Sequence, residues 1–148
     1  MDIGSGNNYP ASALSNFSPH PFERDGVHCK SMEGFLQSLK FQNVEMQLYV
    51  CTLVGKSAKF KGKKKKWWKT QTLYWQGKEI SRDSKQYEEL ITKAYDCLFE
   101  NENFQKALKA TKNATLTHSM GKSKKSETVL TESEFIYQLN RLRQKIIQ

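Results

Sequence analysis

The sequence has few cysteines, and none of them form a closely spaced pair. Cys29, Cys51 and Cys97 are the only three, odd in number and far apart in the chain. This pattern argues against a disulfide framework and against a zinc site built from CxxC pairs. Free thiols are typical of a reducing compartment. The cytoplasm is therefore the expected location, and for a viral protein this means the host cytoplasm.

Metal-ligand clusters and nucleotide fingerprints are also missing. No group of His, Cys and Asp has the spacing of a metal site. The chain contains no Walker loop, no GxSxG elbow and no dinucleotide-binding glycine pattern. We therefore expect neither a metal nor a cofactor.

Long apolar runs are absent, and acidic residues are in deficit. The first ten residues, MDIGSGNNYP, hold no apolar stretch, and no segment approaches the roughly 20 apolar residues that span a bilayer. We expect neither a secretory signal nor a membrane partner. The 15 acidic residues stand against 24 basic ones, which gives a net charge of +9. Such an excess favours polyanionic partners, nucleic acid and phosphorylated ligands among them, without choosing between them.

The residues that are present suffice for one folded domain. The chain has 148 residues, of which 37% are hydrophobic and 11% aromatic. A chain of this size buries roughly 70% of its unfolded surface. Residues 1–13 are polar and rich in Gly, Asn and Ser, so we expect a flexible arm there. Residues 14–148 are expected to form a single domain, mainly α, with one or two small β-hairpins.

Apolar residues at helical spacing predict where the helices lie. In the second predicted helix, Val44, Leu48 and Cys51 should face the core, although its β-branched residues also leave a strand possible. Ser84 or Asp83 is suited to cap a later helix. The helices are expected at residues 32–41, 44–54, 84–99, 102–109 and 132–146.

Turn residues predict the segments between the helices. Asp25-Gly26 between apolar flanks predicts a tight hairpin, and Gln76-Gly77 predicts a short hairpin or a loop. The glycines of the basic segment 55–69 are interpreted as loop residues. The polar stretch 111–130 is expected to be a long loop. It ends at the sequence TESE, residues 131–134, which matches a capping box.

Glu33 is an acid placed next to a predicted core stripe. It lies in the first turn of the helix expected after a Ser31 cap, where the helix dipole favours an ionised carboxylate. One interpretation is a solvated glutamate that serves only the helix start. The other is a pocket acid, because Gln37 and Lys40 share one polar strip with it. The apolar stripe beside this strip holds Met32, Phe35, Leu36 and Leu39.

A run of lysines stands beside two tryptophans in KKKKWWK. The run is either a solvated charged stretch beside core tryptophans or a phosphate-attracting loop next to aromatic faces that stack on bases. Further along, LTHSMGKSKK offers His118 as a general acid or an ordinary loop histidine, together with small residues that suit a phosphate nest. The lysines of the run are Lys63, Lys64, Lys65 and Lys66.

In combination, several motifs resemble the signature of the NADAR family, the YbiA-like proteins. LSNFSPHPFERDG carries an SNF motif and a Pro-Phe hairpin, and SMEGFLQSLKF matches S/T-x-E-x-x-x-Q-x-x-K-F. A basic glycine-containing segment, an Arg-Asp pair, the stretch AYDCLFENENF and a terminal QLNRLR follow in a similar order. The resemblance covers residues 14–143 and implies a compact, mainly α fold.

The resemblance implies an N-glycosidase, which cleaves between a ribose C1 and a nitrogen. Breaking such a bond develops positive charge on the sugar, which a fixed carboxylate can stabilise directly or by activating the attacking water. This role would fall to Glu33, while Lys40 would form a Schiff base with the opened sugar or protonate the leaving base. The residues implied to bind substrate are Ser15, Asn16, Phe17, Gln37, Trp68, Arg82, His118 and Ser119.

Several positions depart from the family pattern. The tryptophan that many relatives carry after the Arg-Asp pair is missing, and Trp68 is expected to replace it. Glycine stands at position 34, where relatives often have His. His118 and Ser119 are expected to substitute for an acidic residue and a YWG motif before the last helix. Their loop and Arg82 are expected to hold pyrophosphate.

Two substrate classes are associated with the family. One is ADP-ribose attached to guanine bases in nucleic acid, and the other is phosphorylated early intermediates of riboflavin synthesis. The net charge of +9 favours nucleic acid, because a free metabolite does not require so basic a protein. We therefore expect reversal of toxin-type ADP-ribosylation of guanine in DNA, as in viral anti-defence. The alternatives are the metabolite glycosidase and a non-catalytic basic module that binds nucleic acid or ADP-ribose.

Overall fold

Six α-helices and two β-hairpins form the part of the chain that the computed structural model describes, residues 1–147. Both hairpins are antiparallel, and they pair β1 (Phe22–Arg24) with β2 (Val27–Cys29) and β3 (Thr72–Trp75) with β4 (Lys78–Ser81). The mainly α fold class is confirmed. The helices are α1 (Met32–Ser38), α2 (Val44–Cys51), α3 (Gly55–Lys63), α4 (Lys85–Leu98), α5 (Glu102–Ala110) and α6 (Glu132–Ile147), with short 3-10 helices η1 (Ser12–Leu14), η2 (Trp67–Lys69) and η3 (Lys125–Glu127).

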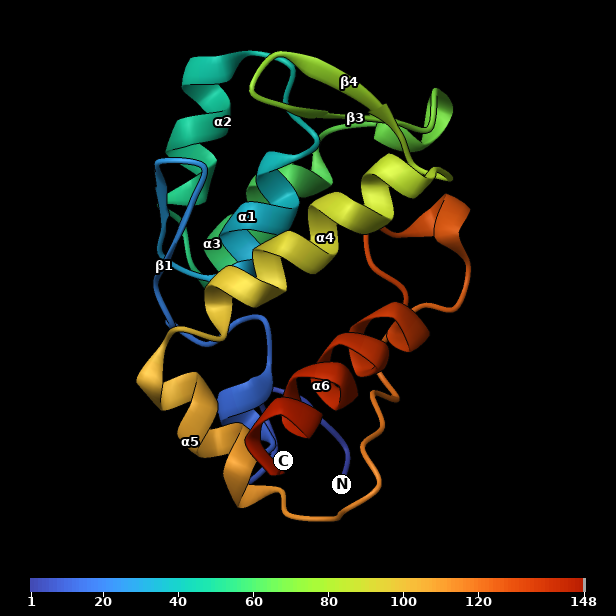
Figure 1. The fold of residues 1–148 in the computed structure, drawn as a ribbon. Coiled ribbons are helices and arrows are strands. Elements are labelled where there is room, and N and C mark those ends of the chain that lie inside the picture. The colour runs from blue at the N-terminus through green and yellow to red at the C-terminus, as the bar shows by residue number, and fades with distance from the viewer. Residues whose placement is uncertain (148) are drawn as a thin grey trace.

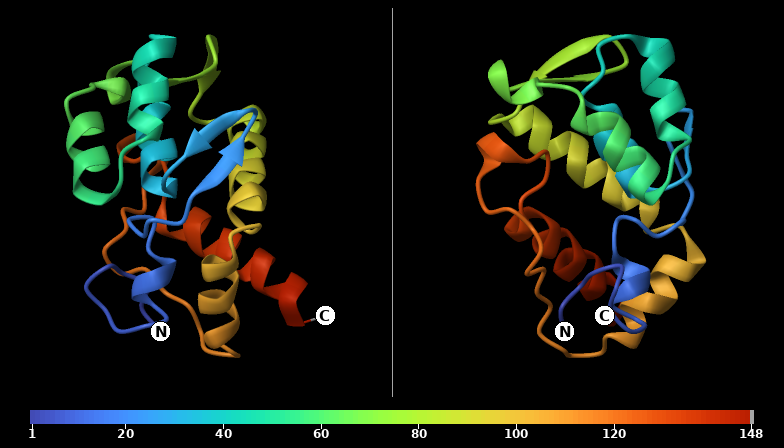
Figure 2. Two further views of the ribbon diagram at one scale, coloured as in Figure 1. Left: turned by 90° about the vertical axis from the view of Figure 1, so that its left-hand side faces the viewer. Right: turned by 180° about the vertical axis from the view of Figure 1, so that it is seen from behind.

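Helix α1 lies in the middle of one end of the molecule (Figure 1). Helices α2, α3 and α4 surround it, and the β3–β4 hairpin lies above it. The N-terminal segment, α5 and the C-terminal part of α6 form the other end (Figures 1 and 2). None of the helices in residues 1–147 combines the length and the apolar character that crossing a bilayer requires.

Side-chain caps begin the helices that the sequence marks most clearly. Ser31 accepts a hydrogen bond from a backbone N–H in the first turn of α1 (3.0 Å), and Ser84 does the same for α4 (3.1 Å). At α6 the capping box is complete. The N–H of Glu134 donates to the Thr131 hydroxyl, and the Glu134 carboxylate accepts from the N–H of Thr131. These three predicted helix starts are confirmed, and each cap stabilises the fold by about 1 kcal/mol.

Both hairpins turn on a pair of residues that ends in glycine. Asp25 and Gly26 have φ angles of 50° and 77°, and Gln76 and Gly77 have φ angles of 50° and 85°. These are the left-handed conformations that a two-residue hairpin turn requires. The two hairpins touch, because the indole Nε1 of Trp75 donates to the Asp25 carboxylate (3.0 Å).

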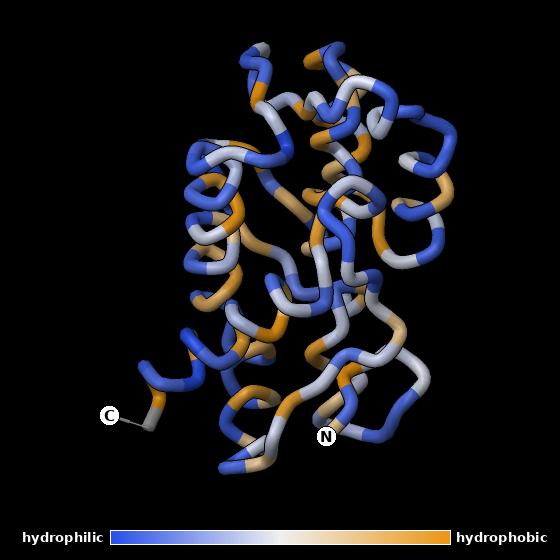
Figure 3. The backbone as a smooth tube through the Cα atoms, turned by 90° about the vertical axis from the view of Figure 1, so that its right-hand side faces the viewer, coloured by the Kyte–Doolittle hydropathy of each residue, from blue (hydrophilic) through white to orange (hydrophobic). Residues whose placement is uncertain are grey.

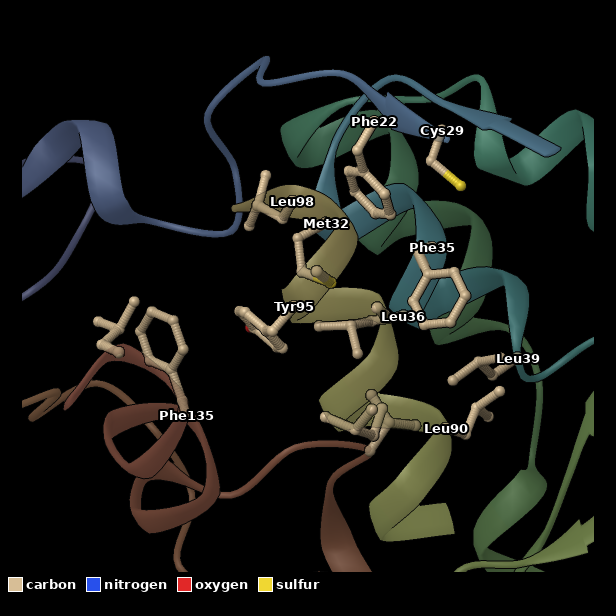
Figure 4. Packing of buried hydrophobic residues seen from close by; sticks show 14 of the residues in the cluster. Phe22, Cys29, Met32, Phe35, Leu36, Leu39, Leu90, Tyr95, Leu98 and Phe135 are labelled. Carbon is tan, nitrogen blue, oxygen red and sulfur yellow. The ribbon is translucent and has the colours of Figure 1, made fainter. Parts of the chain in front are cut away.

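The core forms where the predicted stripe of α1 meets α4 (Figure 4). All four residues of the stripe are buried, and Phe35 packs edge-on against Trp75 with ring centroids 5.1 Å apart. Hydrophilic and hydrophobic residues alternate along the helices (Figure 3). Because one side of α1 is fixed against α4, its polar strip turns toward α3 and the N-terminal segment. Further core residues are Leu90, Tyr95 and Leu98 of α4 and Phe135 of α6.

The basic segment 55–69 is not the loop that its glycines predicted, because most of it is helix. Gly62 lies inside α3, where any larger residue would overlap the side chain of Gln37 in α1. Gly34 likewise lets α1 approach the backbone carbonyls of Val50, Cys51 and Leu53. Glycine therefore marks close contact between helices here, and not a turn.

Helix α2 exists as predicted, and Cys51 is buried as expected, but the prediction that Val44 and Leu48 face the core is wrong. Its buried residues are Gln47, Val50 and Cys51, whereas Val44 and Leu48 are 46% and 45% exposed. Gln47 enters the core because its amide bonds four backbone groups, two of them on the β3–β4 hairpin. A buried polar side chain with this many partners competes successfully with an apolar one.

Residues 1–13, expected to be a flexible arm, instead pack against the rest of the domain. Ile3 is fully buried, and its N–H donates to the carbonyl of Thr117 (2.8 Å). Asp2 forms a β-bridge with Thr117, and its carboxylate accepts from the N–H of Ser119 (2.8 Å). Two buried apolar side chains, those of Ile3 and Ala11, and hydrogen bonds of the backbone and of Asp2 anchor this polar segment, which composition alone did not indicate.

Candidate functional site

Glu33 lies between the SNF segment, residues 15–17, and α3. Its N–H donates to the backbone carbonyl of Asn16 (3.0 Å). Its carboxylate Oε2 accepts a hydrogen bond from Nε2 of Gln37 (2.7 Å). Glu33 is partly buried and Gln37 is buried. The two side chains therefore share the polar strip of α1, and the interpretation of Glu33 as a fully solvated residue is wrong.

The pKa of the Glu33 carboxyl is raised above its ordinary value. Burial is the largest cause, because it penalises the charged form. The hydrogen bond from Gln37 and the nearby side chains of Lys59, Lys40 and His118 offset only part of this effect. The helix dipole predicted a readily ionised acid. In the structure the pKa is raised instead, because the segments packed around the first turn of α1 exclude water from it.

Lys40 follows α1 and is also partly buried. The pKa of its amine is lowered to about 8, and burial is the largest cause. The charge of Glu33 opposes this change, whereas the charges of Lys122 and Lys59 add to it. An amine with this pKa exists in both protonation states near neutral pH. It can therefore serve as a proton donor or as a nucleophile.

Gln37 is held between Glu33 and α3. Its side chain fits only because Gly62 has none. Its Oε1 is buried and has no hydrogen-bond partner among residues 1–147. A buried oxygen without a partner costs about 1–3 kcal/mol. This arrangement persists because the bond from Nε2 to Glu33 and the contact with α3 fix the amide in place.

The SNF segment forms one wall beside Glu33. The Oδ1 of Asn16 accepts from the hydroxyl of Tyr95 (2.7 Å), which turns the Nδ2 of the amide away from Tyr95. Burial raises the pKa of Tyr95 well above its ordinary value, so its hydroxyl stays protonated and donates. Ser15 serves the local turn, because its hydroxyl accepts from the N–H of Phe17 (3.2 Å).

Phe17 joins the SNF segment to α3. Its ring lies against Gly55, where an added methyl group would make ordinary van der Waals contact with it. The Nζ of Lys59 lies 5.9 Å from the centroid of the Phe17 ring. Phe17 and Lys59 therefore stand next to each other at the end of the site that holds Glu33.

His118 reaches the site from the loop before α6. Its Nδ1 lies 2.7 Å from the carbonyl of Ile3, and a carbonyl can only accept, so Nδ1 carries the hydrogen. Its ring packs edge-on against Phe135, with centroids 4.9 Å apart. Ser119 bonds to the N-terminal segment. Its N–H and its hydroxyl both donate to the Asp2 carboxylate, so a carboxylate of the chain itself occupies the donors expected for phosphate.

Arg82 does not have the free guanidinium that a pyrophosphate site requires. It is 2% exposed, and its Nη1 and Nη2 donate to the Glu134 carboxylate (3.2 and 2.6 Å). Its Nε donates to the carbonyl of Thr128 (2.9 Å). The expected substrate contact is thus corrected. Arg82 ties the end of β4 to the start of α6, because Glu134 belongs to the capping box of that helix.

The tryptophans and the lysine run lie further along the basic segment. Trp68 is 51% exposed, and the Nζ of Lys69 lies 5.9 Å from its ring centroid, whereas Trp67 is buried. None of the contacts of Glu33 and Lys40 described above involves Trp68, so its place in the pocket stays a prediction. All four lysines of residues 63–66 are exposed.

Three residues near Glu33 were not identified from the sequence. Lys59 was assigned to a loop, and its position in α3, one turn before Gly62, places it beside Phe17. Lys122 was one of several lysines in a polar stretch. Tyr95 fits a core stripe, and its hydroxyl gave no sign of bonding to Asn16. The lysines carry no local signal, because only the packing of α1, α3 and the loop before α6 brings them together.

Comparisons with known proteins place the chain among phage proteins. It matches the family described as "Bacteriophage protein GP30.3" over residues 8–144. It is 40% identical over 151 residues to an "Uncharacterized 17.1 kDa protein in Gp30-rIII intergenic region" of Enterobacteria phage T4, which covers 99% of this chain and 98% of that protein.

The fold has a solved counterpart. The NMR structure of the E. coli protein YbiA matches with a TM-score of 0.65 and 17% identity, covering 99% of this chain and 84% of that one. The resemblance to the YbiA-like proteins is therefore confirmed at the level of the fold. Because the family match spans most of the sequence, the chain belongs to the bacteriophage GP30.3 family.

Proposed function

We propose that this protein is an N-glycosidase that releases ADP-ribose from ADP-ribosylated guanine in DNA or a related nucleic acid. The observation that carries the proposal is the setting of Glu33. A partly buried carboxylate with a raised pKa, held by Gln37 at 2.7 Å, lies beside an amine with a lowered pKa. Acids and amines whose pKa values are shifted by burial and that act on each other through their charges are typical of catalytic sites. The NADAR-like motif at residues 31–41 supports the same reaction type.

The proposed reaction uses both groups. Water attacks the ribose C1, the bond from C1 to the guanine nitrogen breaks, and its electron pair leaves with that nitrogen. Ionised Glu33 stabilises the positive charge on the sugar and accepts the proton that the water loses. Protonated Lys40 supplies a proton to the departing nitrogen. In the second route, neutral Lys40 attacks C1, and guanine leaves with the electron pair of the broken bond and takes up the proton that the amine loses. The bond from C1 to the ring oxygen then opens to give a Schiff base, and water hydrolyses it to release ADP-ribose and restore the amine.

The charges around this pair suit an anionic substrate. Lys59 and Lys122 lie close enough to Lys40 to lower the pKa of its amine. With Arg82 bound to Glu134, these two lysines take the pyrophosphate role that the sequence assigned to Arg82. The Nδ2 of Asn16, which is turned away from Tyr95, is placed to donate a hydrogen bond to a substrate hydroxyl. An ADP-ribosyl group offers both kinds of group, pyrophosphate and ribose hydroxyls.

The relatives supply a biological setting for this activity. The matched family and the T4 protein are phage proteins. A phage enzyme of this kind would remove ADP-ribose that a host toxin attaches to phage DNA. The protein would then act in anti-defence.

The direct test measures release of ADP-ribose from a guanine-ADP-ribosylated single-stranded oligonucleotide. Wild type is compared with Glu33→Gln and with Glu79→Gln, in which an exposed glutamate of β4 is changed in the same way. We expect release by wild type and by Glu79→Gln, and a loss of at least a hundredfold in Glu33→Gln. Equal release by all three would show that Glu33 takes no part in the reaction.

Absence of release by wild type would redirect the search. The next substrates are phosphorylated early intermediates of riboflavin synthesis, tested with the same variants. If these also stay intact, the protein is a binding module for nucleic acid or ADP-ribose, and Glu33→Gln should bind as wild type does.

A further inference from the structure

A second concave surface lies on the side of α3 that faces away from Glu33. Lys59 and Lys61 are two positions apart in this helix, so their side chains project to opposite sides of it. The charge of Lys59 lowers the pKa of Glu33, whereas Lys61 lines a groove between α2 and the end of α3. We call this the α2–α3 groove. It has a volume of about 1050 Å³, and its lining includes Phe41, Glu45, Tyr49, Lys61, Lys64 and Lys65.

Lysines and aromatic rings are paired along this groove. The Nζ of Lys61 lies 5.9 Å from the ring centroid of Tyr49, and that of Lys65 lies 5.1 Å from the ring of Phe41. Both pairs lie within the range of a cation–π contact. A further pair lies next to the groove, where Lys64 reaches to 4.8 Å from the ring of Phe60.

Two of these rings are open to solvent. Tyr49 is 52% exposed and Phe60 is 64% exposed. Aromatic residues that gather on a surface in this way mark a binding site more often than a structural position. Three lysines and one glutamate line the α2–α3 groove, so its charge is positive. The ligand it fits is a polyanion that also presents flat apolar faces.

We propose that the α2–α3 groove binds single-stranded DNA that flanks the modified guanine. The inference rests on the proposed glycosidase function and extends it to the substrate strand. Phosphates contact the lysines, and unpaired bases stack on Tyr49. The groove lies across α3 from Glu33 but meets the site at one end, because Lys40 belongs to the site and Phe41, the next residue, lines the groove. One continuous strand can therefore occupy both.

A single strand fits this surface better than a duplex. Stacking on an exposed ring requires a base whose face is free, and bases in a duplex cover one another. The same argument applies to the modified guanine, which has to leave a base stack before its sugar linkage can reach Glu33.

The test measures the Kd of an unmodified, fluorescein-labelled oligo-dT strand by fluorescence anisotropy. The first variant is Tyr49→Ala, and its matched control is Tyr137→Ala, which removes a tyrosine of α6 that is also more than half exposed. We expect Tyr49→Ala to raise the Kd about fivefold or more, the effect of losing one stacked base. The control should change it less than about twofold.

The second variant reverses charge. Lys61→Glu combined with Lys65→Glu is compared with Lys106→Glu combined with Lys109→Glu, on exposed residues of α5 at the other end of the molecule (Figure 1). Both double variants change the net charge equally. We expect the groove variant to weaken binding at least tenfold more than the α5 variant. Wild-type binding should also weaken with salt, with a slope near −2 if about three phosphates are contacted.

The outcomes separate this inference from the glycosidase proposal. Binding of the unmodified strand needs no catalysis, so Glu33→Gln should bind as wild type does. If release occurs, the groove variants should raise KM for a modified oligonucleotide and leave a modified mononucleotide unaffected. Equal losses in the groove and α5 variants would overturn the inference. So would tighter binding of a duplex, or of an RNA strand of the same length.

Discussion

Replacing Glu33 by glutamine should change the pH dependence of stability in a predictable direction. Burial raises the pKa of Glu33, so the folded state holds this proton to a higher pH than the unfolded chain does. The sign follows from proton linkage. The stabilising contribution of protonated Glu33 is present in full below its unfolded pKa and is lost as the pH rises through its folded pKa. Wild type should therefore lose stability relative to Glu33→Gln across this window.

The size of the effect follows from the shift. Each unit by which the pKa is raised corresponds to about 1.4 kcal/mol. In a domain of this length, 1 kcal/mol moves Tm by about 2–4 °C, so each unit should appear as about 4 °C. Gln37 can still donate to the new amide oxygen, so the variant keeps the contact that positions residue 37.

The assay is the difference in Tm between Glu33→Gln and wild type, measured by differential scanning calorimetry near pH 4 and near pH 7. The upper value is kept below about 8, the pKa of Lys40, so that this amine stays mostly protonated in wild type. We expect the difference to become more positive by several degrees at the higher pH. Glu79→Gln, on an exposed residue, should show no such trend.

The opposite trend would refute the reasoning. A difference that becomes more negative toward pH 7 would mean that the folded pKa of Glu33 is lowered. The helix dipole, which stabilises an N-terminal carboxylate by about 0.3–1 kcal/mol, would then outweigh burial. In that case Glu33 would be a solvated residue of the helix start.

Two further predictions concern Lys40 and Arg82. Turnover should change with pH around 8, the pKa of Lys40, and Lys40→Arg should remove this change. A turnover rate that falls above pH 8 identifies the amine as the proton donor, and a rate that rises identifies it as the nucleophile. Arg82→Met should lower the unfolding free energy by about 3 kcal/mol in urea, because it leaves the buried side of Glu134 unpaired. Since the bonds from Arg82 and Thr131 outweigh burial and hold the pKa of Glu134 below its ordinary value, this loss should diminish as the pH falls through the folded pKa. An unchanged KM in the folded variant would confirm that Arg82 does not contact substrate.

Local patterns predicted most of the fold. The stripe of α1, the caps at Ser31 and Ser84 and the turn at Asp25-Gly26 each depend on residues within a few positions of one another. Such signals survive in a single sequence because the chain nearby is sufficient to satisfy them. The same is true of the polar strip, since Glu33 and Gln37 are one helical turn apart.

Contacts between distant segments were not predictable in this way. Gly62 looked like a loop residue, although its purpose is the close approach of α3 to Gln37. Arg82 looked like an anion ligand, although Glu134, 52 positions later, occupies its guanidinium. The upward shift of the pKa of Glu33 was not predicted for the same reason, because the burial that raises this pKa comes from segments far apart in sequence.

Gly62→Ala offers a test of how closely the site and the α2–α3 groove are linked. An added methyl group would overlap Gln37, so either α3 shifts outward or Gln37 leaves Glu33. A shift of α3 moves Lys59 and Lys61 together and should weaken both turnover and binding of single-stranded DNA. Displacement of Gln37 alone should lower kcat and leave the Kd of the strand unchanged. In either case overpacking should lower the unfolding free energy by about 1–3 kcal/mol, measured in urea. Unchanged turnover together with an unchanged Kd in a folded Gly62→Ala variant would contradict this link between the site and the α2–α3 groove.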